Sequence, residues 1–182
     1  METAKFTLFD TAIGRCAIAW NARGIVCVQL PEADDAKTRA RIRRRFANAL
    51  EAAPAAEIER AIAAIVALLE GKRRGLDDIA LDMTNVGAFE RRVYEIARTI
   101  PPGEVLTYGD IAKRLGDPGA AQAVGQALGK NPFAIVVPCH RVVGAGDSLG
   151  GFSAGGGTRT KRRMLAIERS PAAGTADLFE AR

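Results

Sequence analysis

Residues 101–129 read PPGEVLTYGDIAKRLGDPGAAQAVGQALG. The opening Pro-Pro-Gly ends any helix that precedes it, and Thr107 is a residue type that caps the start of a new one. The GDPG stretch at residues 116–119 separates a helix expected over residues 108–115 from another over residues 120–129. Two short helices joined by a tight turn are the outline of a helix-turn-helix.

The second expected helix of this pair is built almost entirely from small residues. Val124 and Leu128 can face inward, while Gln122 and Gln126 lie four residues apart on another face. A helix that reads base edges in the major groove carries long hydrogen-bonding side chains, and this helix has few. Its slimness favours contact with a nucleic-acid backbone or minor groove. A packed helix hairpin that never meets nucleic acid fits this feature equally well.

Upstream of residue 31 the pattern is that of a meander of short strands. Strands are expected over residues 6–9, 16–20 and 25–30, separated by turn signals. A basic helix is expected over residues 38–50 and an amphipathic one over residues 57–69.

The pattern changes again after residue 78. A returning strand is expected over residues 79–83, and a helix with Phe89, Val93, Ile96 and Ile100 on one face begins after it. We therefore predict an α/β domain, then a mostly helical one, then a mobile tail. Their ranges are 1–83, 84–170 and 171–182.

Composition limits the class of protein. The chain has 182 residues, 48% of them hydrophobic, and a net charge of +5, which suits polyanionic partners without requiring them. No basic start precedes a long apolar run, and no stretch nears the roughly 20 apolar residues of a membrane span. We expect a cytoplasmic protein that does not enter membranes.

The three cysteines, Cys16, Cys27 and Cys139, are odd in number and lack CxxC spacing. This argues against a disulfide framework and against a structural zinc site. Cys16 and Cys27 fall in expected strands and are predicted to be core residues.

Residues 135–143, IVVPCHRVV, place Cys139 directly before His140, the single histidine of the chain. A nucleophilic cysteine needs a base or a lowered pKa, because the thiolate is the attacking species. Side chains at adjacent positions usually diverge, so a buried cysteine beside an incidental histidine remains an alternative.

The stretch PCHRV at residues 138–142 resembles the active-site motif of the methylated-DNA–protein-cysteine methyltransferases, the O6-alkylguanine-DNA alkyltransferase family. Further matches occur in the family's order at residues 103–108 (GEVLTY), 123–125 (AVG), 131–132 (NP) and 151–156 (GFSAGG). The resemblance covers about residues 86–168. More loosely, the first half is similar to the family's ribonuclease-H-like domain, so the implied fold is α/β followed by a helix-turn-helix, winged-helix-like alkyltransferase domain.

The resemblance implies catalytic roles for four residues. Cys139 would accept the alkyl group, His140 would act as a base through a water, and Glu168 would orient His140. Tyr108 would crowd the phosphate, promote rotation of the nucleotide and donate to guanine O6. Thioether formation would be irreversible, so each molecule would act once.

Binding positions are implied in the same way. Arg141 would tie the active-site segment to the fold, the backbone of Val142 would read the base, and Ser153 would offer an amide to O6. Phe152 stands where tyrosine is frequent and keeps a stacking face. The remaining motif positions carried over as binding residues are Thr107, Ala123, Gly125 and Asn131.

The sequence departs from the family pattern at two places. Gln122 stands where an arginine commonly fills the hole left by the flipped base, and glutamine brings no charge and a shorter reach. The glycine-rich loop over residues 150–160 is about two residues longer than the common pattern. We expect the longer loop to admit adducts bulkier than methyl.

The implied substrate is duplex DNA carrying O6-alkylguanine, with O4-alkylthymine as a further candidate. Binding is expected through the minor groove, without sequence specificity, by a monomer that needs no metal or cofactor.

Three other functions remain. One is a noncatalytic sensor that flips alkylated bases and recruits other repair proteins, although such sensors lack the acceptor cysteine. A sequence-specific regulator is disfavoured by the small residues of the second helix. A cysteine hydrolase would differ in releasing more product than protein.

Two sets of basic residues are weighed for DNA contact. The first set is predicted to be a solvated helical face: Arg39, Arg41, Arg43, Arg44 and Arg45. The second set is the better candidate for DNA: Lys113, Arg114, Lys130, Lys161, Arg162 and Arg163.

Overall fold

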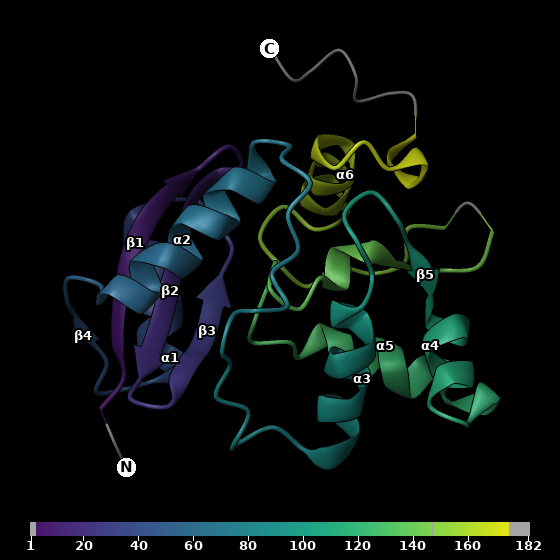
Figure 1. The fold of residues 1–182 in the computed structure, drawn as a ribbon, viewed down its shortest axis with the longest axis horizontal. Coiled ribbons are helices and arrows are strands. Elements are labelled where there is room, and N and C mark those ends of the chain that lie inside the picture. The colour runs from purple at the N-terminus through teal and green to yellow at the C-terminus, as the bar shows by residue number, and fades with distance from the viewer. Residues whose placement is uncertain (1–2, 147, 175–182) are drawn as a thin grey trace.

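The computed structural model describes residues 3–146 and 148–174, and Figure 1 shows a sheet-containing half beside a helical half. The first half contains β1 (Lys5–Thr11), β2 (Gly14–Asn21), β3 (Gly24–Gln29), α1 (Asp35–Arg45), β4 (Leu50–Glu51) and α2 (Ala56–Leu69). The strands form one sheet in the order β3-β2-β1-β4, antiparallel except for the parallel β1–β4 pair. The expected meander and the mixed α/β class are confirmed.

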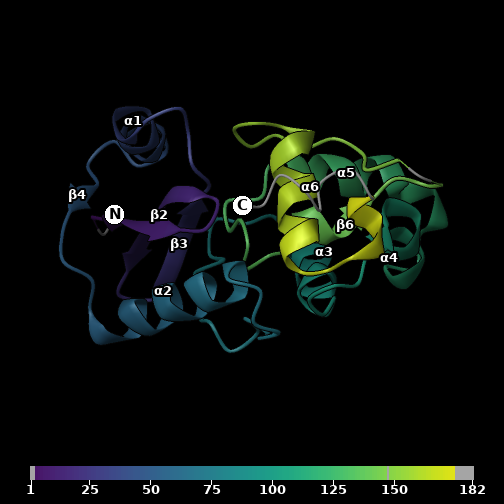
Figure 2. The ribbon, with the colours of Figure 1, turned by 90° about the horizontal axis from the view of Figure 1, so that it is seen from above.

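Helices cover both faces of this sheet (Figure 2). Strand β2 consequently buries five residues in succession, because alternate side chains point to opposite, equally covered faces. Ala17 and Ala19 pack in the same cluster as Ile42 of α1. Ile18 and Trp20 pack in the cluster that contains α2.

The predicted basic helix extends too far at its C-terminus. Helix α1 ends at Arg45, and Leu50–Glu51 is a short strand instead. The backbone N–H of Leu50 donates to Ala4 O at 3.0 Å, and that of Ala52 donates to Phe6 O at 2.9 Å. Pairing with the free edge of β1 therefore overrides the helical pattern here.

The strand expected over residues 79–83 is reduced to one bridge, between Ile25 and Leu81. Strand β3 cannot extend this pairing, because Val28 N–H donates to Pro132 O at 2.8 Å and uses the same edge. Two segments distant in sequence thus share the outer edge of β3.

The second half contains α3 (Ala88–Arg98), β5 (Leu106–Thr107), α4 (Tyr108–Arg114), α5 (Ala121–Gly129), β6 (Val142–Val143) and α6 (Thr158–Ile167). Both helices of the expected pair form, joined by a 3-10 turn at Pro118–Ala120. Helix α4 begins with a capping box, in which Thr107 Oγ1 accepts from Asp110 N and Asp110 accepts from Thr107 N.

A single hydrophobic cluster runs through both halves and includes Ile65, Val93, Phe133 and Met164. At the C-terminal side a 3-10 turn, Pro171–Ala173, carries the buried Ala173, so the chain stays packed beyond residue 170. The rest of the predicted tail, residues 175–182, lies outside the described residues. Among the described helices, none has the length and apolar character to cross a membrane.

Candidate functional site

Cys139 begins a 3-10 turn, Cys139–Arg141, immediately before β6. Strand β6 pairs in parallel with β5, with Leu106 opposite Val142. This short pairing fixes the Cys139 turn beside the start of α4, where Tyr108 is the first helical residue.

Asn131 braces the segment that precedes the cysteine. Its Nδ2 donates to Val137 O at 2.9 Å, and its Oδ1 accepts from Phe133 N at 2.9 Å. Within this braced loop Ile135 has φ of 72°, a left-handed conformation that is unfavourable for a β-branched residue. Strain of this kind is often found at functional sites.

The Cys139 side chain is partly exposed and lines a cavity. Burial raises its pKa, against the opposing effects of a hydrogen bond with Asn131, the positive charge of Lys161 and the backbone amides of the turn. The thiol is therefore protonated at neutral pH, and a reaction at sulfur needs a proton acceptor.

Behind the cysteine lies a buried network of His140, Arg141 and Glu168. His140 Nε2 lies 2.8 Å from Glu168 Oε1. Arg141 donates to both carboxylate oxygens, at 2.9 and 2.8 Å, and also to Ile100 O at 2.6 Å. Every nitrogen of the guanidinium is thus committed to holding the Cys139 turn against the rest of the chain.

Both titratable members of this network have displaced pKa values. Burial would raise the pKa of Glu168, but the hydrogen bonds and charges of His140 and Arg141 outweigh it and lower the pKa to about 2. Burial lowers the pKa of His140, although Glu168 opposes that effect. At neutral pH the pair is a carboxylate and a neutral imidazole.

A neutral imidazole carries one proton, and the position of Glu168 assigns it to Nε2. The other ring nitrogen, Nδ1, is buried and accepts no hydrogen bond from the residues that the structure describes. His140 therefore has a buried ring nitrogen with a lone pair that can accept a proton, on the residue next in sequence to Cys139.

In front of Cys139 lies a cavity of about 620 Å³. Tyr108 forms part of its wall, and the Tyr108 hydroxyl lies 3.5 Å from Gly151 O. Ser153 Oγ donates to Gly129 O at 3.0 Å and joins the glycine-rich loop to the end of α5. The predicted binding residues that line this cavity with Cys139 and Tyr108 are Gln122, Gly125, Phe152 and Ser153.

Five other predicted binding residues do not line this front cavity, and one of them is Arg141, which belongs to the buried network behind Cys139. Thr107 caps α4, and Ala123 is exposed on the outer side of α5. Val142 is buried, and its carbonyl accepts from Lys161 at 2.6 Å. Asn131 lines a different cavity on the other side of Cys139.

Lys161 is a site residue whose position the sequence analysis missed, because it grouped this lysine with the candidates for DNA contact. It is fully buried, so its expected contact with DNA phosphate is wrong. Its ammonium lies 5.9 Å from the ring centres of both Tyr108 and Phe152, and burial lowers its pKa to about 8. The buried Met164 and Leu165, three and four residues on, were the available signal for an inward-facing position.

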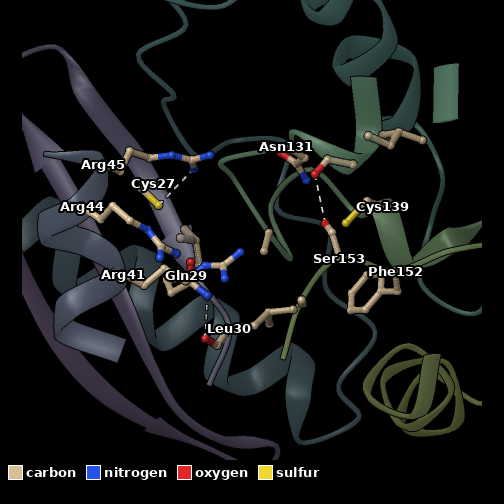
Figure 3. A pocket seen from close by; sticks show the side chains of 15 residues that line it. Cys27, Gln29, Leu30, Arg41, Arg44, Arg45, Asn131, Cys139, Phe152 and Ser153 are labelled. Carbon is tan, nitrogen blue, oxygen red and sulfur yellow. Dashed lines mark hydrogen bonds between the residues drawn. The ribbon is translucent and has the colours of Figure 1, made fainter. Parts of the chain in front are cut away.

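The second cavity, of about 300 Å³, lies between Cys139 and the first half of the chain (Figure 3). Strand β3 and helix α1 form its far wall, and Arg41, Arg44 and Arg45 all line it. These three arginines were predicted to lie on a solvated helical face, and the structure shows that they also line a cavity that contains Cys139. Arg39 lies outside this cavity and forms a bidentate ion pair with Glu51.

Comparisons with known proteins agree with this geometry. Residues 88–170 match the family model described as 6-O-methylguanine DNA methyltransferase, DNA binding domain. The chain is 50% identical over 103 residues to a methylated-DNA--protein-cysteine methyltransferase of Mycolicibacterium paratuberculosis, a segment covering 57% of this chain and 61% of that protein. The chain thus matches less than two thirds of the length of this curated relative.

Solved structures match over more of the chain. One is the crystal structure of Mycobacterium tuberculosis OGT in complex with DNA, at 34% identity and a TM-score of 0.74, covering 93% of this chain and 96% of that one. Another is the O6-methylguanine-DNA methyltransferase from Pyrococcus kodakaraensis strain KOD1, at 28% identity and a TM-score of 0.69, covering 91% and 99%.

Proposed function

Because the chain belongs to the O6-methylguanine-DNA methyltransferase family, we propose that it repairs DNA by moving an alkyl group from guanine O6 onto its own Cys139. The observation that carries this proposal is the thiol of Cys139, which lines the front cavity, followed in sequence by His140, whose buried Nδ1 has no hydrogen-bond partner among the described residues.

The thiol is activated by the network behind it. Glu168 holds the His140 tautomer in which Nδ1 accepts a proton, and that proton comes from Cys139 through a bridging water. Glu168 then stabilises the imidazolium that forms, while Arg141 keeps the carboxylate ionised and in place. Lys161 and the backbone amides of the turn favour the thiolate.

Transfer is a displacement at the alkyl carbon. The sulfur–carbon bond forms as the carbon–O6 bond breaks, and the electron pair of the broken bond goes to guanine O6. Tyr108 and the amide of Ser153 would donate to that oxygen and lower the barrier. Burial raises the pKa of Tyr108, so its hydroxyl stays protonated and able to donate.

The base must leave the duplex before a protein thiol can reach O6. In our proposal α4 and α5 act as a helix-turn-helix that binds the minor groove without sequence preference, as a monomer. The small residues of α5 permit close approach, Gln122 occupies the space of the flipped base, and the base enters the front cavity. Gly125, Ala123, Thr107, Asn131, Phe152 and the backbone of Val142 are assigned to binding and support.

The first half of the chain, residues 1–83, is proposed to be a ribonuclease-H-like domain, and residues 84–170 the alkyltransferase domain. Three antiparallel strands, a parallel fourth and helices on both faces support the first assignment. The thioether formed on Cys139 is not cleaved by water under ordinary conditions, so each molecule is consumed by one transfer.

Mass spectrometry tests the proposal directly. The wild type and Cys139→Ala are incubated with excess duplex carrying O6-methylguanine, and intact and digested proteins are weighed. We expect one methyl group per wild-type molecule, located on the Cys139 peptide, and none on the variant.

Two other outcomes would overturn this function. Tight binding to the lesion without any change of protein mass would indicate the sensor. Release of more product than protein would indicate a turnover hydrolase.

A further inference from the structure

The smaller cavity gives a group attached to Cys139 a second direction in which to extend. It shares Cys139, Phe152 and Ser153 with the front cavity, so the two spaces meet at the sulfur. Its far wall belongs to the first half of the chain, where Arg41, Arg44 and Arg45 of α1 lie (Figure 3).

This smaller cavity is strongly positive. Arg41, Arg44 and Arg45 line it, and no carboxylate is among the residues that do. Arg41 is partly neutralised by Glu32, at 3.3 Å. In the described part of the chain no ion pair joins Arg44 or Arg45 to a carboxylate, and Arg45 instead donates to the buried Cys27 Sγ at 3.7 Å. An anion placed among these cations would therefore be stabilised.

The size of the cavity favours a small anion. About 300 Å³ is at the lower end of the volumes of small-molecule sites, so it can hold the end of an adduct but not a duplex. The arginines lie on α1, in the opposite half of the chain from the α4–α5 pair that we propose as the DNA contact. A charged group that reaches Cys139 with the base fits both the size and the position.

The geometry of displacement points the same way. Sulfur and O6 must lie on opposite sides of the reacting carbon, so any further group on that carbon extends sideways. With the base in the front cavity, the arginine-lined cavity is the neighbouring space beside Cys139.

Building on the proposed function, we infer that the arginine-lined cavity receives the far end of adducts that carry a negative charge. Guanine O6 adducts ending in a carboxylate are then preferred to neutral adducts of equal size, and Arg44 and Arg45 set this preference.

The reaction with the simplest such adduct is balanced without another reagent. The Cys139 thiolate attacks the methylene of O6-carboxymethylguanine, a sulfur–carbon bond forms and the carbon–O6 bond breaks. Guanine O6 takes the electron pair, and the proton given up by the thiol replaces the alkyl group on the base. The products are S-carboxymethylcysteine and guanine.

Matched duplexes test the inference. One carries O6-carboxymethylguanine and the other O6-carbamoylmethylguanine, which has the same number of heavy atoms and no charge. The second-order rate constant of transfer is measured for each by mass spectrometry, with O6-methylguanine as the reference. We expect the wild type to prefer the carboxylate by several-fold, because the arginines on the far wall attract a negative charge across the cavity.

The chain supplies a matched control on the same helix. Arg44→Gln and Arg45→Gln should each reduce the carboxylate-to-amide ratio towards one. Arg43→Gln removes the same charge, but Arg43 lies over the Phe6 ring at 5.6 Å and does not line the cavity. It should leave the ratio unchanged. All three arginines are exposed, and thermal melting verifies that each variant is folded.

The outcomes separate the possible failures. A ratio of one in the wild type, with normal methyl transfer, overturns the inference and leaves the proposed function intact. Equal slowing of all three substrates in Arg44→Gln and Arg45→Gln also overturns it and assigns the arginines to DNA phosphate. No transfer from any duplex by the wild type would refute the function itself.

Discussion

The two sides of Cys139 are built in opposite ways. Behind it, the Glu168 carboxylate accepts from His140, from Arg141 and, at 3.3 Å, from Gly103 N, and all of these groups are buried. In front, the wall is a glycine-rich loop that Ser153 joins to α5. The proposed function explains the difference, because its proton acceptor has to be fixed before the reaction, whereas a cavity that receives a flipped base has to open.

The largest effect should come from Glu168→Gln, which disrupts the buried network behind Cys139. The amide would turn an N–H towards Arg141 or His140 and leave a buried guanidinium without its anion. We expect the free energy of unfolding at pH 7 to fall by about 3 kcal/mol and transfer to slow at least a hundredfold. Urea unfolding and single-turnover transfer measure the two effects.

The pH dependence of stability gives an internal check on this prediction. The pKa of Glu168 is lowered to about 2, from an ordinary value near 4.5. Its stabilisation is therefore complete above about pH 4.5 and is lost as the pH falls towards 2. Glu168→Gln should lack this part of the acid transition, while Glu95→Gln, at an exposed position, should keep it. Identical acid profiles for Glu168→Gln and wild type would contradict the buried ion pair.

Lys161→Met tests the buried lysine that lies near Tyr108 and Phe152 of the front wall and donates to Val142 O behind Cys139. The lysine pKa of about 8 means that the fold favours the neutral amine, so keeping the charge buried at pH 7 has a free-energy cost. We expect the variant to be about 1 kcal/mol more stable at pH 7, since the lost hydrogen bond offsets part of that gain. Transfer should slow about tenfold, because the thiolate loses a neighbouring positive charge.

The pH profile separates charge from packing at this position. The free energy of unfolding of the wild type should rise between pH 8 and 10.5, because in this range the folded protein has lost the lysine proton while the unfolded chain still binds it. Lys161→Met should lack that rise. Lys113→Met, at an exposed position, serves as the control. A large loss of stability in Lys161→Met would show that the lysine is held for packing instead.

Gly150→Ala perturbs the open side. Gly150 has φ of 69°, and a Cβ there would lie 2.7 Å from the Tyr108 hydroxyl oxygen, so the ring must move. We expect transfer to slow about fivefold. Separately, the left-handed alanine should lower the free energy of unfolding by about 1 kcal/mol. Gly146→Ala has a similar φ of 65° with nothing within 4 Å of the added Cβ, so it isolates the backbone cost. Equal rates for the two variants would remove Tyr108 from the argument.

Gln122→Arg should have the smallest effect. In the proposed function Gln122 occupies the space that the flipped base leaves, so an arginine there would add charge and reach, and transfer from duplex DNA should quicken about threefold. Free O6-benzylguanine needs no flipping and should react at the wild-type rate. Gln126→Arg adds the same charge one turn along α5, at the same cavity. Equal acceleration by both variants, or with both substrates, would exclude a specific role in flipping.

The sequence was most informative where structure depends on local pattern. The meander of β1, β2 and β3 follows from alternation and turn residues, and the α4–α5 pair from its capping and breaking residues. The fate of residues 50–51 and 79–83 depended on competition for sheet edges, which no local pattern contains.

The chemical site divides in the same way. Cys139, His140 and Arg141 are consecutive and carry a recognisable motif, whereas Lys161 resembles its exposed neighbours until α6 is packed. Arg41, Arg44 and Arg45 share a helical face by spacing alone. That this face lines a cavity at Cys139 depends on how the two halves pack together.

The shared edge of β3 has a consequence for folding during synthesis. Ribosomes release the sheet first, but the edge groups of Ile25 and Val28 find their partners only when Ala80 and Pro132 have followed. Until then the nascent chain exposes an unpaired, apolar strand that can recruit a strand of another chain and aggregate. The segments around Ala80 and Pro132, of which the second leads into the Cys139 turn, therefore also protect the sheet, and a chain truncated before them should aggregate.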